Sequence, residues 1–139
     1  MRGISAIAVS SVRVAIAWFS VMTASVALAG EFDVAKLGRP TKVLLYDGGQ
    51  IVMERAIAKD SDESKAVLAW LEAHKDGWRR AGFHTYAPHC LVYGDNFKID
   101  FSDTFCVLNY RQKNDGPMDR VILKIRKGDS IPDVFKRAK

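Results

Sequence analysis

The chain contains 139 residues, of which 48% are hydrophobic and 27% are charged. This composition is typical of one ordinary globular domain, and it excludes a long disordered tail, a collagen-like repeat and a multidomain enzyme. Lysine and arginine (21) outnumber aspartate and glutamate (16), but the charges are unevenly placed. Every acidic residue lies after position 30, whereas Arg2 and Arg13 precede it, which sets the first residues apart from the rest.

Residues 1–29 have the organisation of a cleavable export signal. The two arginines supply positive charge, and an apolar stretch then runs from Val14 to Val26. The small residues of Ala27-Leu28-Ala29 follow, which predicts cleavage before Gly30. The apolar run after the second arginine covers about 16 residues, fewer than the roughly 20 that span a bilayer, so an uncleaved anchor is the weaker alternative. We expect a periplasmic or secreted protein with no membrane-spanning segment after cleavage.

The mature chain is predicted to begin with a lead-in over residues 30–41 and then a hairpin. Lys42–Tyr46 is a short apolar run with strand character. The glycines that follow Asp47 suit a hairpin turn, because glycine adopts positive φ at little cost. Gln50–Ala58 then alternates between apolar and polar residues, which predicts a second, partly exposed strand.

The strongest helix prediction covers residues 61–81. Asp60 and Glu63 stand in a capping-box arrangement, in which the aspartate accepts hydrogen bonds from backbone groups that lack a partner inside the helix. Gly82 is a natural end, because glycine tolerates the left-handed conformation that terminates many helices. We therefore expect one long helix that begins at the aspartate and ends at the glycine.

This helix is predicted to be amphipathic. At about 100° per residue, one narrow arc collects four large side chains, which are Val67, Leu71, His74 and Trp78. Charged residues fall on the opposite side, so one face is built for burial and the other for water. His74 is accordingly expected to be a packed core histidine rather than a ligand.

Short strands are predicted to follow the helix, separated by turns. Their ranges are Phe83–Ala87, His89–Tyr93, Asn96–Phe101, Phe105–Tyr110 and Arg120–Arg126, and a short helix is expected from Ser130 to Lys139. Turns this short cannot make parallel crossovers, so the sheet should be mainly antiparallel. We predict that residues 30–139 form a single α+β domain with about five to six strands, one face covered by the amphipathic helix, and a docked C-terminal helix.

The two cysteines of the chain, Cys90 and Cys106, leave two arrangements open. Thiols in an oxidising compartment usually pair, and closing the 15-residue loop between them would contribute about 3 kcal/mol. Two-residue turns at Gly94-Asp95 and Ser102-Asp103 would instead place both cysteines opposite Ile99, one on each side. Their separation would then be about 9.6 Å, beyond the roughly 7 Å that a disulfide allows. The sequence predicts either a disulfide with a different strand pairing or two buried free thiols.

Few groups in the chain suit catalysis or metal binding. His84 and His89 are an odd number of residues apart on a predicted extended segment, so they tend to face opposite ways and do not converge on a metal ion. We predict no catalytic residue, no metal ligand and no cofactor. The enzyme hypothesis that remains is a dispersed site around His84 and His89, with Asp100 as a third group.

The function that the sequence favours is a small, exported, non-enzymatic binding protein, for example an inhibitor or an immunity-type protein. Its partner would be a protein or an anionic envelope component, and no nucleic acid is expected. Tyrosine is common at interfaces, and the candidate interface residues are Tyr86, His89, Tyr93 and Tyr110, although a core position is equally open to the tyrosines.

The C-terminal part of the chain suggests an alternative function. Residues 111–139 hold nine basic and four acidic residues. Such a segment is often a solvated outer strand face, where lysine and arginine discourage edge-to-edge pairing. It could also contact anionic lipid or cell-wall polymer, which would make the protein an envelope-associated structural protein.

The export prediction is tested by the intact mass of protein purified from cells. We expect the first residue to be Gly30, and the protein to leave the cytosol, because the small residues before it fit a signal peptidase. A soluble cytosolic product that still begins with Met1 would contradict both expectations.

Overall fold

A computed structural model describes residues 32–82, 87–113, 115–126, 129–130 and 132–136 of the chain. The predicted leader lies outside these residues. His84, Tyr86 and most of the strand predicted for Phe83–Ala87 also lie outside them.

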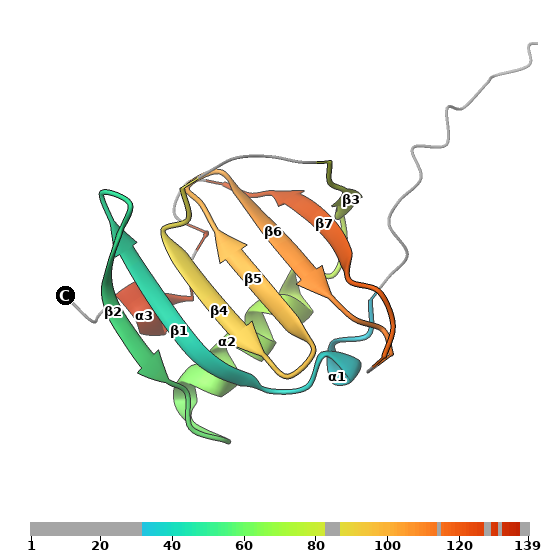
Figure 1. Cartoon of the computed structure of the whole chain (residues 1–139), viewed down its shortest axis with the longest axis horizontal. Helices are drawn as coiled ribbons and strands as arrows, with labels where there is room; N and C mark the ends of the chain where they lie inside the picture. Colours follow the sequence, from blue (N-terminus) through green and yellow to red (C-terminus); the bar gives the residue numbers. More distant parts are fainter. Residues whose placement is uncertain (1–31, 83–86, 114, 127–128, 131, 137–139) are drawn as a thin grey trace, which may run out of the picture.

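Seven strands form one sheet in the order β2-β1-β4-β5-β6-β7-β3 (Figure 1). They are β1 (Pro40–Asp47), β2 (Gln50–Ala56), β3 (Arg79–Arg80), β4 (Cys90–Gly94), β5 (Phe97–Phe101), β6 (Phe105–Tyr110) and β7 (Asp119–Lys124). The helices are α1 (Val34–Leu37), α2 (Asp62–Ala73) and α3 (Asp133–Lys136). All neighbouring strands run antiparallel, so the predicted α+β fold is confirmed, although the sheet has more strands than expected.

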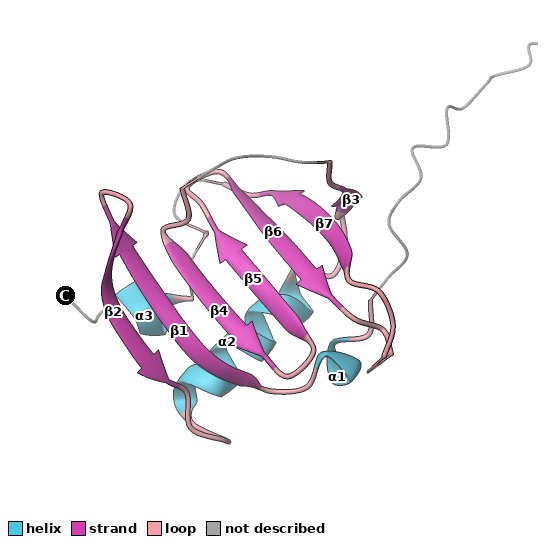
Figure 2. Ribbon diagram, viewed as in Figure 1, coloured by secondary structure: helices cyan, strands magenta, loops and turns pink. Residues whose placement is uncertain are grey.

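The helices α2 and α3 lie on one side of the sheet (Figure 2). Side chains alternate between the two faces of a strand, and the strand residues that point toward α2 are mostly apolar and buried. They pack with Val67, Trp70 and Leu71 of α2 into a single core. The predicted cover of one sheet face by one helix is therefore confirmed.

The first hairpin forms where the sequence predicts it. Gly48 and Gly49 have φ values of 55° and 80°, which is the left-handed conformation that the turn requires. A bulge between Leu45 and Tyr46 disturbs the pairing of β1 with β2. Bulges are common on edge strands and disfavour pairing with another chain.

The helix begins one residue later than the capping prediction placed it. Ser61 is the N-cap residue, and its side chain accepts a hydrogen bond from the backbone N–H of Ser64. Asp60 lies outside the helix with φ 59°, and Glu63 forms an ion pair with Arg55 of β2. The predicted capping role of Asp60 is therefore wrong, because the serine that follows it takes that role.

The helix also ends earlier than residue 81. His74 is the C-cap residue, and Gly77, at φ 86°, turns the chain so close to Leu123 that an added Cβ would lie 3.2 Å from a Leu123 methyl. Trp78 is still buried, and its indole N–H donates to the His74 carbonyl. The residues after Trp78 form the short edge strand β3, which pairs with β7. The long-helix prediction fails here because Trp78 is buried, as the helical spacing of apolar residues predicts, although its backbone is no longer helical.

The pairing of β4, β5 and β6 settles the arrangement of the cysteines. Cys90 and Cys106 both lie opposite Phe101, one on each neighbouring strand, and both are free thiols. Each turn lies one residue later than predicted, so Phe101 replaces Ile99 as the shared neighbour. Two strand spacings, about 9.6 Å, still separate the cysteines. The free-thiol alternative is the one that the structure shows.

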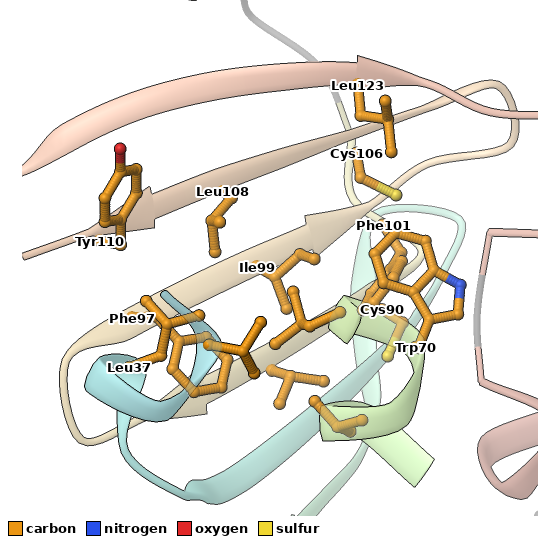
Figure 3. Packing of buried hydrophobic residues seen from close by; sticks show 14 of the residues in the cluster. Leu37, Trp70, Cys90, Phe97, Ile99, Phe101, Cys106, Leu108, Tyr110 and Leu123 are labelled. Atoms are coloured by element: carbon orange, nitrogen blue, oxygen red, sulfur yellow. The ribbon is translucent and has the colours of Figure 1, made fainter. Parts of the chain in front are cut away.

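Both thiols lie in the core beside Phe101 and Trp70 (Figure 3). The ring of Trp70 meets that of Phe101 edge-on, with centroids 4.9 Å apart. Burial raises the pKa of Cys90 from 9.0 to about 12, with a smaller contribution from Asp100. Burial likewise raises the pKa of Cys106 well above its ordinary range. In the folded protein both groups are therefore neutral, apolar packing units near neutral pH.

The C-terminal segment docks against the end of α2. The Trp70 indole N–H donates to the Asp129 carbonyl at 3.0 Å, and a ring nitrogen of His74 lies 3.0 Å from an Asp129 carboxylate oxygen. The rings of Trp70 and His74 stack at 4.0 Å. His74 is thus partly buried at the edge of the core, where it connects α2 to Asp129. Phe135 of α3 is 2% exposed. A short C-terminal helix docks as predicted, but α3 (Asp133–Lys136) begins three residues after the predicted start at Ser130.

The state of the cysteines is tested by thiol titration. We expect two reactive thiols per chain in denaturant without reductant, and very slow reaction of the native protein, because both sulfur atoms are buried and protonated. A count of two only after reduction would contradict the arrangement.

The raised thiol pKa values also predict a loss of stability at high pH. A thiol with a raised folded-state pKa stabilises the fold fully below about pH 9, and this contribution falls as pH rises toward 12. Above the pKa of the unfolded thiol, the free energy of unfolding should fall by about 1.4 kcal/mol per pH unit for each thiol. We expect urea unfolding of the Cys90→Ala variant to show a shallower loss between pH 9 and 10.5 than the original chain. Equal slopes would show that this thiol does not ionise with unfolding.

Candidate functional site

The sheet face turned away from α2 is a surface that the described helices leave uncovered. Figure 1 shows it toward the viewer, and no helix of the described ranges lies on it. We call it the open face. The register gives its members as Lys42, Leu44, Tyr46, Leu91, Tyr93, Lys98, Asp100, Phe105, Val107, Asn109, Arg120, Ile122 and Lys124, with Ile51, Glu54 and Ala56 on β2 and Arg79 on β3.

An apolar row crosses the middle of the open face. Leu44, Leu91 and Val107 belong to this row, and each is at most 6% exposed. Asp100 lies in the same row at 4% exposed, and the Lys98 ammonium is 3.7 Å from its carboxylate. A buried carboxylate needs such partners, since an isolated buried charge is costly. The apolar row is therefore buried and does not itself form the outer surface of the face.

A second row, parallel to the first, carries the charge. Its members are aligned strand by strand from β1 to β7, and they are Lys42, Tyr93, Lys98, Asn109 and Arg120. Cations thus alternate with neutral groups across the sheet. We call this set the cation row.

Contacts along the cation row hold its side chains in place. The ammonium groups of Lys42 and Lys98 lie 5.0 and 6.0 Å from the centroid of the Tyr93 ring, within the range of cation–π attraction. Lys42 also forms an ion pair of 3.2 Å with Glu54. The Tyr93 ring therefore sits between two ordered cations.

The far end of the row is ordered in a similar way. The Arg120 guanidinium donates to the Asn109 side-chain oxygen at 2.7 Å. Asn109 is only 8% exposed, so its amide is a fixed anchor for the arginine. Ordered cations lose less conformational entropy on binding than mobile ones, which favours this row as a contact surface.

Tyr46 lies beside these groups on the same face. Its pKa is raised by burial, and by the nearby Tyr93 and Asp100, while Lys42 acts in the opposite direction. The phenol therefore stays neutral and can donate a hydrogen bond well above neutral pH.

A hollow of about 320 Å³ lies at one end of the open face, beside the cation row. Its lining includes Tyr93, Lys98, Arg111 and Met118. The backbone N–H of Arg111 donates to the Asn96 carbonyl at 2.9 Å, so the β6 pairing continues past Tyr110 and carries Arg111 to the open side. Met118 is 47% exposed. An exposed methionine between cations and a tyrosine is typical of an adaptable binding surface.

The predicted interface residues fall in different places. Tyr93 is on the open face, while Tyr110 is 3% exposed on the opposite face, with its ring centroid 5.6 Å from that of Phe32. His89 lies near the turn between β5 and β6, where its ring is 3.6 Å from the Asp103 carboxylate. Tyr86 lies outside the described residues.

The groups of the enzyme hypothesis are not gathered into one site in the described ranges. His89 pairs with the exposed Asp103, whereas Asp100 is buried opposite Leu91 of β4. His84 lies outside the described residues. Among the residues that the structure describes, no three His, Cys, Asp or Glu side chains form a set that could hold a metal ion.

Sequence reasoning missed most of the cation row. The alternation of Lys98 and Asp100 with apolar residues is visible in the sequence, and so is the basic character after residue 110. The sequence does not show that β1 pairs with β4, which places Lys42 beside Tyr93 and in line with Lys98.

Comparison of the chain with protein-family models, with curated proteins and with solved structures finds no match. None of the helices in the described ranges has the length and hydrophobicity of a membrane span.

Proposed function

We propose that this protein is a small, exported binding protein without enzymatic activity, which holds a protein partner from the envelope or from outside the cell on its open face. The observation that carries the proposal is the cation row, in which ordered lysines flank Tyr93 on a sheet face that no described helix covers.

The residue types of the open face support a role in protein binding. Tyrosine, arginine and methionine are enriched at interfaces, and binding energy concentrates on a few such residues. Tyr93, Arg111 and Met118 meet at the hollow beside the cation row. A partner side chain that enters this hollow would contact an aromatic ring, a thioether and a guanidinium at once.

The place of action rests on the leader sequence. A chain cleaved before Gly30 would meet its partner in the periplasm or outside the cell. A compact sheet-and-helix domain that binds through one face is the kind of device that inhibitors and immunity proteins use, and this analogy concerns the class only.

Site-specific photocrosslinking tests the proposal. A photoreactive residue placed at position 111 would label a partner from an envelope extract, whereas one at Lys65, exposed on α2, would not. We expect a single partner band from the first position, and about tenfold weaker binding of that partner by the Tyr93→Ala variant, in line with the loss of an interface anchor.

The Lys65→Gln variant is the matched surface control and should bind the partner as the original chain does. Unfolding in urea should show that Tyr93→Ala remains folded. Equal labelling from both positions, or full binding by folded Tyr93→Ala, would overturn the assignment of the open face.

A further inference from the structure

We infer that the open face is built for an acidic polypeptide segment in the polyproline II conformation, with carboxylates at every third residue. This inference rests on the proposed function and names the chemistry of the partner. It follows from the spacing of the cations in the cation row rather than from their number.

The cations of the row lie on alternate strands. Lys42 is on β1, Lys98 on β5 and Arg120 on β7, and one neutral residue lies between each pair. Neighbouring strands are about 4.8 Å apart, so the backbone positions that carry successive cations are spaced by about 9.6 Å across the sheet. A ligand that crosses the strands and pairs with all three fits best when its negative charges repeat at about that interval.

A polyproline II helix meets this interval most closely. It has three residues per turn and rises about 3.1 Å per residue, so side chains three residues apart lie on one side at about 9.3 Å. An α-helix returns to the same side after seven residues, at about 10.5 Å, which overshoots. A β-strand places residues three apart on opposite sides, so it cannot present them to one face.

The neutral members of the row fit the same ligand. A polyproline II backbone makes no internal hydrogen bonds, so its carbonyl groups stay available for outside donors. The Tyr93 hydroxyl is such a donor, and its strand, β4, lies between the strands that carry Lys42 and Lys98. The segment would therefore gain backbone contacts at the positions where the row has no cation.

The same face is less suited to an anionic membrane. The apolar row, with Leu44, Leu91 and Val107, is buried and cannot insert into lipid. The exposed Glu54 lies beside Lys42 and would face the lipid phosphates. Carboxylates of the protein at fixed positions repel an acidic chain there, which favours a ligand whose own carboxylates are spaced apart.

Two peptide isomers test the inference. One is a labelled ten-residue peptide of glutamate, proline and alanine with a glutamate at every third position. The other has the same composition with its glutamates adjacent. We expect the protein purified from cells to bind the spaced isomer at least about fivefold more tightly at low salt, by fluorescence anisotropy, since only it can pair with the whole row.

Variants with matched chemistry locate the site. Lys98→Gln removes a cation without adding a charge beside Asp100, and Arg120→Gln provides a second, independent loss. Each should weaken binding of the spaced isomer by about fivefold and reduce the difference in affinity between the two isomers. Lys65→Gln makes the same chemical change on exposed α2 and should alter neither affinity.

Equal affinity for the two isomers would overturn the inference, as would equal losses from Lys98→Gln and Lys65→Gln. Sedimentation with phosphatidylglycerol vesicles, without binding of either peptide, would overturn it in favour of a membrane. If the photoreactive residue at position 111 still labels a protein partner while the isomers bind alike, the proposed function stands and only the spacing inference fails.

Discussion

The packing of Trp70 against Phe101 is the contact around which this fold is arranged. Phe101 lies on β5, near the centre of the sheet, and β4 and β6 place a cysteine on each side of it. Trp70 covers it from α2, and its indole N–H also fixes the C-terminal segment at Asp129. One aromatic pair thus joins the sheet, the long helix and the chain end. The helices α2 and α3 lie on this side of the sheet, and the described helices leave the other side uncovered (Figure 2).

The two sheet faces divide the work of the protein between them. The face toward α2 supplies the apolar burial that drives folding. The open face keeps an apolar row beneath a layer of ordered charge, so long side chains with buried stems present their polar ends to solvent. Binding through such a face needs little rearrangement, since Lys42, Lys98 and Arg120 already have contacts that define their positions. On the proposed function, stability and recognition would therefore depend on different residues of the same strands.

Local patterns predicted the elements of this fold better than their arrangement. The hairpin around Gly48, the alternation of β5 and the buried arc of α2 follow from nearest-neighbour chemistry, and they were predictable. The early end of the helix was not, because Trp78 keeps the helical period while its backbone leaves the helix. The cation row was not predictable either, since residues more than 50 positions apart, such as Lys42 and Tyr93, meet only through strand order. Pairing over such distances is set by the whole sheet rather than by any local segment.

The two unpaired sulfur atoms have a consequence for how a cell would produce this protein. The native sheet needs no thiol oxidase or disulfide isomerase, because Cys90 and Cys106 are buried as free thiols. If the chain is exported as proposed, it carries two thiols of ordinary reactivity before it folds, and a bond between them would join β4 to β6, which β5 separates in the native sheet. Folding of the sheet would then compete with oxidation of the two thiols. A chaperone that shields the unfolded chain would favour folding more than a redox catalyst would.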